Sequence, residues 1–63
     1  MQPHQERVIA ELKELSDKHD KLCQFLVGTV FSTLSNAEQS RLRRQCAYMG
    51  LYRDVLTERI EAF

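Results

Sequence analysis

The sequence predicts an all-α fold in which two long helices form an antiparallel, coiled-coil-like hairpin that assembles into a helical-bundle oligomer. The composition favours helix, with only two glycines and one proline in 63 residues. Apolar side chains recur every three or four residues in two long segments, and turn signals separate those segments. We therefore expect a single helical-hairpin domain over residues 1–63, with a helix at 3–27, a turn at 28–35 and a helix at 36–62.

The first helix is predicted from a heptad seam of mostly apolar residues. Its members are Val8, Leu12, Leu15, His19, Leu22 and Leu26. Pro3 suits the first turn of a helix, Glu6 favours the positive end of the helix dipole, and Gly28 is a stop signal. Only His19 breaks the apolar pattern, in the stretch "LSDKHDKL".

The connection "GTVFSTLSNAEQ" is predicted to turn the chain back. Ser35 followed by Glu38 fits a capping box, in which each side chain satisfies a backbone donor at the start of the second helix. Phe31 and Leu34 are three residues apart, so we expect one short turn whose apolar side closes the end of the hairpin.

The second helix is predicted from Leu42, Met49, Leu56 and Phe63, which recur every seven residues, and from Cys46 and Ile60. The two seams match along their whole length when the helices are antiparallel. The register pairs Leu26 with Leu42, Leu22 with Cys46, His19 with Met49, Leu15 with Tyr52 or Arg53, Leu12 with Leu56, and Val8 with Ile60.

The apolar surface of the two helices exceeds what one two-helix interface can cover. The residues beside the seams are Ile9, Cys23 and Phe25 on the first helix and Tyr48, Val55 and Ala62 on the second. A broad apolar stripe is typical of a helix in a bundle, and a chain of this length buries little surface when it folds alone. We expect a homodimer that forms a four-helix bundle, or a higher oligomer.

His19, Cys23 and Cys46 have side chains typical of metal ligands, and the register brings them to one level, so three zinc ligands are available. The seam geometry, however, points His19 inward and leaves Cys23 on the flank. Paired helices lie about 8–10 Å apart, which disfavours a disulfide. We therefore expect His19 to pack against Met49, with pH-responsive and ligand roles as alternatives, and we predict no metal site and no cofactor.

The stretch "SRLRRQCAYMGLYRD" combines arginines that can grip phosphates with tyrosine rings that can stack on a base. Its arginines are Arg41, Arg43, Arg44 and Arg53, and its tyrosines are Tyr48 and Tyr52. Two such faces in an oligomer could build an anion pocket. The alternative is a solvated face whose arginines pair with Glu38 and with Glu14, Asp17 or Asp20 of neighbouring helices.

Several functions are disfavoured by composition. Nine basic and nine acidic side chains balance, so nucleic-acid binding is not expected. The longest nearly apolar run, "FLVGTVF", is too short to cross a bilayer, and no secretion signal is recognisable, so we expect a cytoplasmic protein with reduced cysteines. No nucleophile has an evident base partner and no paired carboxylates suggest a cleft, so we do not expect an enzyme.

Three segments, "ERVIAELKELSDKHDKLCQFL", "FSTL" and "RLRRQCAYMGLYRDVLTERI", resemble a family of small phage and prophage helical-hairpin proteins related to a reading frame of a crAss-like phage. The first helix ends in a Leu-x-x-Phe step at Leu22 and Phe25, and Phe31 follows in the turn. The second helix carries the matching run Gln45, Met49, Tyr52, Leu56, Arg59 and Ile60. His19 departs from the aliphatic residue expected at its position.

The resemblance implies a phage or prophage origin and a life in the cytoplasm of a bacterial host. By analogy with small phage proteins that sequester nucleotide immune signals, it implies a non-catalytic binding protein that inhibits a host defence component. Within this reading, the candidate ligand-binding residues are Arg41, Arg44, Tyr48 and Tyr52. The rival prediction is a protein-interaction or structural module without a small ligand.

Overall fold

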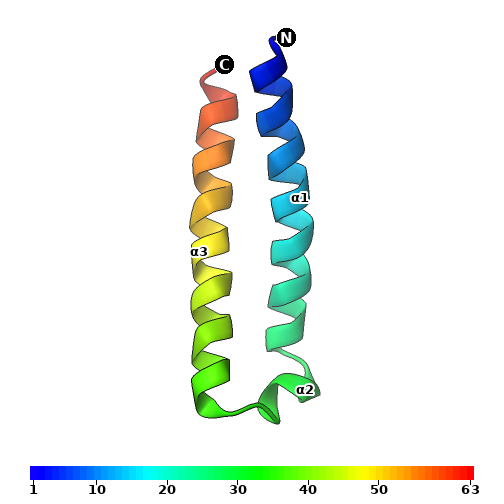
Figure 1. Ribbon diagram of the computed structural model, residues 1–63, viewed down its shortest axis with the longest axis vertical. Helices are drawn as coiled ribbons and strands as arrows, with labels where there is room; N and C mark the ends of the chain where they lie inside the picture. Colours follow the sequence, from blue (N-terminus) through cyan, green and yellow to red (C-terminus); the bar gives the residue numbers. More distant parts are fainter.

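The computed structural model describes all 63 residues as three helices without a strand, which confirms the all-α prediction (Figure 1). Helix α1 spans Pro3–Leu26, α2 spans Thr29–Ser32 and α3 spans Asn36–Glu61. The two long helices lie side by side and run in opposite directions, so both termini lie at one end and α2 at the other. No helix combines the length and the apolar character that crossing a membrane requires.

Helix α1 begins at Pro3, whose fixed φ suits a first helical turn. The backbone N–H of Gln2 donates to Oε1 of Gln5 at 2.9 Å, which satisfies a donor that the helix leaves free. The helix ends at Leu26, one residue before the expected end. Gly28 then caps α2 with extended backbone angles, φ −87° and ψ 167°, so it does not use the left-handed region that glycine alone tolerates.

The short helix α2 closes the end of the molecule around Phe31, which is buried. The ring of Phe25 meets the Phe31 ring edge-on, with centroids 6.3 Å apart. From α3, Nε2 of Gln39 donates to the backbone oxygens of Phe31 and Leu34, at 3.2 and 3.0 Å. The expected turn at Phe31 and Leu34 is thus a helical turn that starts earlier and is fixed by a side chain of α3.

Only half of the predicted capping box forms at the start of α3. The hydroxyl of Ser35 accepts a hydrogen bond from the backbone N–H of Glu38 at 3.2 Å. The Glu38 carboxylate instead pairs with Nε of Arg41 at 2.8 Å. The Glu38 carboxylate therefore turns along the helix toward Arg41 and leaves the backbone N–H of Ser35 without its bond.

The seam residues lie between the two long helices. Val8 and Leu56 are buried, and together with Phe31 they are the only buried residues of the chain. Phe63 lies beyond the end of α3 and is exposed, and the other nine seam residues are half-buried: Leu12, Leu15, His19, Leu22, Leu26, Leu42, Cys46, Met49 and Ile60. A two-helix contact covers each residue from one side only, which leaves most of the seam partly exposed.

The contacts around His19 add detail to the predicted register. The neighbours of His19 on α3 are Cys46, Gly50 and Arg53, which surround the expected partner Met49 along the helix, and Cys46 contacts Cys23, next to the expected Leu22. Side chains of packed helices interdigitate, so a residue inserts between several residues of its partner helix. One-to-one pairing along the seam therefore misses the nearest contacts.

The molecule is a rod, with principal extents of 46 × 14 × 13 Å. Its Cα radius of gyration is 14.5 Å, whereas a compact domain of this length has about 11 Å. The accessible surface is 4799 Å², against about 4,200 Å² for a typical folded monomer of this mass. The single chain therefore leaves more surface in water than a self-contained domain does.

Candidate ligand-binding site

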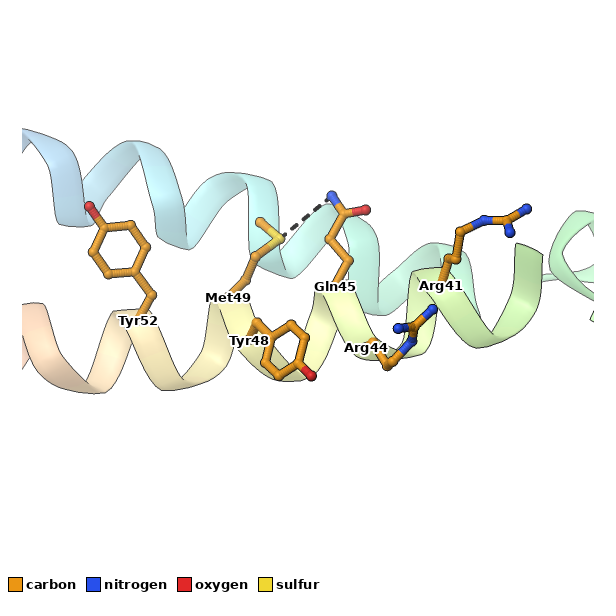
Figure 2. A pocket seen from close by; sticks show the side chains of 6 residues that line it. All are labelled: Arg41, Arg44, Gln45, Tyr48, Met49 and Tyr52. Carbon is orange, nitrogen blue, oxygen red and sulfur yellow. Dashed lines mark hydrogen bonds between the residues drawn. The ribbon is translucent and has the colours of Figure 1, made fainter. Parts of the chain in front are cut away.

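The four candidate ligand residues line one open hollow of about 450 Å³, which we call the arginine hollow (Figure 2). Its lining consists of Arg41, Arg44, Gln45, Tyr48, Met49 and Tyr52. All six residues belong to α3, where steps of three or four residues lead from Arg41 through the neighbours Arg44 and Gln45, and then Tyr48 and Met49, to Tyr52. Such residues share one side of a helix, so the helical period alone assembles the hollow.

The side chains form two rows along the hollow. Figure 2 shows Arg44 and Tyr48 lying across α3 itself, while the other four extend toward α1. Sequence reasoning missed Gln45 as a lining residue and assigned Met49 to the seam alone. The spacing of both residues from Arg41 and Tyr52 is the signal that would have placed them here.

The five arginines of α3 have different surroundings. Arg41 pairs with the Glu38 carboxylate at 2.8 Å, as the solvated-face alternative expected. The guanidinium carbon of Arg43 lies 5.0 Å from the centre of the Phe31 ring, and Arg53 binds Asp20 at 3.1 Å. Arg44 and Arg59 form no ion pair, no side-chain hydrogen bond and no cation–π contact, and of these two only Arg44 lines the hollow.

Both tyrosines of the hollow offer ring surface to solvent. Tyr48 is 64% exposed and Tyr52 is 44% exposed. Tyr48 follows Arg44 by one helical turn and Tyr52 follows Tyr48 by another. An unpaired guanidinium next to aromatic faces is an arrangement that accepts an anion joined to a planar ring.

An apolar stripe on α3 borders the arginine hollow and includes its tyrosines. It consists of Tyr48, Leu51, Tyr52 and Val55, and its two aliphatic members are 61% and 50% exposed. Their spacing of three and four residues places them on one side of α3. We call this surface the α3 stripe; the sequence pointed to its tyrosines and Val55 but not to Leu51.

A second group, the thiol–imidazole cluster, joins the middle of α1 to α3. It consists of His19, Cys23 and Cys46, all half-buried, and the two sulfur atoms lie 2.9 Å apart. Cys23, which was expected on the flank of the seam at the level of Cys46, directs its sulfur to that of Cys46. The Cys23 thiol, through its hydrogen bond, raises the pKa of the Cys46 thiol above its ordinary value, and burial raises it further.

Comparison with protein families gave one match, in which the model of the Sequestin family aligns with residues 2–62. No curated protein and no solved structure is similar enough to this chain to count as a match.

Proposed function

The chain belongs to the Sequestin family, and we propose that it is a non-catalytic homo-oligomer that sequesters a nucleotide signal between its subunits. The family name denotes a sequestering role. The observation that carries the ligand class is the free guanidinium of Arg44 beside two exposed tyrosine rings. A guanidinium fork binds phosphate oxygens, and an aromatic ring stacks on a nucleobase.

The arginine hollow offers the length that such a ligand needs. From Arg41 to Tyr52 the helix rises by about 16 Å, so phosphate contacts at one end and base stacking at the other do not compete for space. The ion pair of Arg41 with Glu38 is exposed, and an exposed pair contributes little stability. Arg41 is therefore able to turn toward a phosphate and join Arg44.

The position of the α3 stripe supports capture between subunits. The stripe exposes Leu51 and Val55 directly beside the tyrosines of the hollow. A second copy that packs on these apolar side chains would also cover the open side of the hollow. We propose that the antiparallel hairpin pairs in this way into a homodimeric four-helix bundle or a higher oligomer, which also supplies the core that one chain lacks.

The biological setting of the proposal rests on the sequence resemblance to small phage and prophage proteins. A protein encoded by a phage or prophage acts in the bacterial cytoplasm, where the host's nucleotide immune signals are made. Capturing such a signal would inhibit the defence component that responds to it, without any catalytic step.

One alternative function has an observation of its own. The α3 stripe would serve equally as a docking surface for a host protein, because exposed aliphatic and tyrosine side chains in one contiguous row are typical of interaction surfaces. In that case the protein is an interaction module without a small ligand, and Arg44 contributes only to the rim of the contact.

A thermal-shift screen of the purified chain with cyclic dinucleotides and ADP-ribose derivatives separates the two functions. A ligand present at about 100 times its Kd stabilises the folded protein by about 2.7 kcal/mol, which raises the Tm of a domain of this size by about 10 °C or more. We expect the shift to be lost in Arg44→Gln and kept in Arg59→Gln, which removes the same charge outside the hollow.

Light scattering on the same samples gives the assembly state. An oligomer stabilised by one nucleotide class through Arg44 supports sequestration. An oligomer that no nucleotide stabilises favours the interaction module, and a chain that stays monomeric with and without ligand contradicts capture between subunits.

A further inference from the structure

The thiol–imidazole cluster brings three metal-ligating atoms from two helices to one point. His19 and Cys23 lie one turn apart on α1, and Cys46 faces them from α3. The ligand atoms all lie within 4.8 Å of one another. We propose that this cluster is a binding site for one thiophilic cation, Zn²⁺ in preference, held by His19 Nε2 and the two cysteine sulfurs.

The distances approach those of tetrahedral zinc, and two adjustments remain: the sulfurs must separate, and the Cys23 sulfur must move closer to His19. With Zn–S bonds of about 2.3 Å and Zn–N bonds of about 2.0–2.1 Å, a sulfur and a nitrogen ligand lie about 3.6 Å apart and two sulfurs about 3.8 Å apart. The Cys46 sulfur already lies 3.6 Å from His19 Nε2. The sulfurs, 2.9 Å apart as hydrogen-bonded thiols, need to separate by about 0.9 Å, which small χ1 rotations provide.

Gly50 makes room for the imidazole. A Cβ atom at this position would lie 3.4 Å from both Cε1 and Nε2 of His19, so any larger side chain would displace the ring from α3. Alanine would just touch the ring, so the ring contact requires a small residue at position 50, although glycine itself is unfavourable inside a helix. The glycine thus keeps Nε2 beside the Cys46 sulfur, in the position a metal ligand needs.

The hydrogen bond from Arg53 determines which ring nitrogen of His19 carries the proton, and it disfavours metal binding at Nε2. Its Nη1 lies 3.0 Å from His19 Nδ1 and 3.1 Å from Oδ1 of Asp20. A guanidinium can only donate, so Nδ1 accepts and the ring proton sits on Nε2, which faces Cys46. A metal on Nε2 moves that proton to Nδ1, and Arg53 then keeps only its bond to Asp20.

Three of the four tetrahedral positions are filled by the chain, and the fourth is open. His19 also lines a second hollow of about 390 Å³, which gives solvent access to the imidazole side of the cluster. Three protein ligands with one open position are typical of zinc sites that exchange a ligand. Such an ion would cross-link the middle of the two long helices, apart from the arginine hollow.

Cobalt titration of the reduced full-length chain tests the site. Tetrahedral Co²⁺ bound by thiolates has intense visible bands and a sulfur-to-metal charge-transfer band in the near ultraviolet. We expect these bands to saturate at one Co²⁺ per chain and to disappear when Zn²⁺ is added. Circular dichroism on each sample establishes that the helices are intact.

The variants identify the ligands one by one. Cys23→Ser, Cys46→Ser and His19→Asn should each weaken Co²⁺ binding by about 100-fold, because metal affinity depends on every ligand. His4→Asn is the matched control, since this exposed histidine lies at the start of α1, and it should leave binding unchanged. Arg53→Gln should tighten binding by about tenfold, because it removes a cation and frees Nδ1 to carry the proton.

The proposal is overturned if the folded chain gives no charge-transfer band, or if His19→Asn binds as tightly as the unmodified chain. Saturation at one ion per two chains would equally overturn it, because the ligands would then come from cysteines of two copies. If a serine variant loses its helices, Arg53→Gln takes its place in the test. Tighter Co²⁺ binding by Arg53→Gln would place the bound ion next to Arg53.

Discussion

The guanidinium carbon of Arg43 lies 5.0 Å from the centre of the Phe31 ring, while the next residue, Arg44, faces the arginine hollow without a partner. Consecutive residues of a helix point about 100° apart, so two adjacent arginines serve different surfaces. Arg43 fastens α2 onto the end of α3. Arg44 keeps its charge available to a ligand.

Replacing Arg43 by Gln should lower the free energy of unfolding by about 0.5–1 kcal/mol, the strength of an exposed cation–π contact. Nucleotide-dependent stabilisation should be unchanged, because Arg43 does not line the hollow. Urea unfolding with and without ligand measures both quantities. Arg44→Gln should lose the nucleotide-dependent stabilisation and keep the free energy of unfolding. If both variants lose the nucleotide-dependent stabilisation equally, Arg43 and Arg44 do not have separate roles.

Leu56→Ala should be the most destabilising single truncation in the seam. Leu56 is 0% exposed, and removing a fully buried leucine side chain costs about 2–5 kcal/mol through lost burial and the cavity left behind. Chemical denaturation followed by circular dichroism measures the loss. Val27→Ala, at a highly exposed position, is the control and should change stability by less than about 0.5 kcal/mol.

Val55→Glu tests whether the α3 stripe is an interface between copies. A carboxylate placed in an apolar contact loses its hydration, so the assembly should dissociate toward the 7.4 kDa chain in light scattering. Val55 lines neither hollow, so neither proposed site is touched directly. Ser40→Glu adds the same charge at an exposed position outside the stripe and both hollows and should leave the mass unchanged; if both variants dissociate alike, the stripe is not the contact.

Gly50→Ala should stabilise the protein by about 0.5–1 kcal/mol, since alanine is the better helix former. The added Cβ would lie 3.4 Å from the His19 ring, an ordinary contact distance, so no clash offsets the gain. Gly50→Leu should be destabilising because its longer side chain has to displace the ring. Thermal unfolding of the two variants checks the opposite signs, and stabilisation by leucine would mean that the ring is not held there.

Much of the architecture could be predicted because the helical period is visible in the chain itself. The heptad spacing from Val8 to Leu26 and from Leu42 to Ile60 identifies the two long helices and the side on which each is shielded. The same period places Arg41, Arg44, Tyr48 and Tyr52 on one side of α3, where the hollow lies. A hollow whose lining comes from one helix can be located from the helical period alone.

The features that sequence reasoning missed depend on contacts between elements. Cys23 lies off the ideal seam, and only the interdigitation of α1 with α3 brings its sulfur to Cys46. The Glu38 carboxylate can accept a hydrogen bond from the backbone N–H of Ser35 or pair with Arg41, and in the structure it pairs with Arg41. Neither result is encoded in the spacing of residues along one helix.

Oxidation should link Cys23 to Cys46 within one chain. Their sulfurs lie 2.9 Å apart, and an external disulfide such as oxidised glutathione would take up the two electrons and two protons that bond formation releases. The bridge closes a loop of more than twenty residues, so it should stabilise the folded chain by about 3 kcal/mol. Non-reducing mass spectrometry and thermal unfolding measure the link and its effect.

Cys23→Ser is the control for this oxidation, because it leaves one thiol that can pair only between chains. Cobalt binding and the disulfide require the same sulfurs, so the oxidised protein should lose the charge-transfer band and regain it after reduction. A chain that forms only intermolecular bridges would show that the two sulfurs are not neighbours in solution. The reduced and oxidised forms of one sample thus test the same geometry by two independent chemistries.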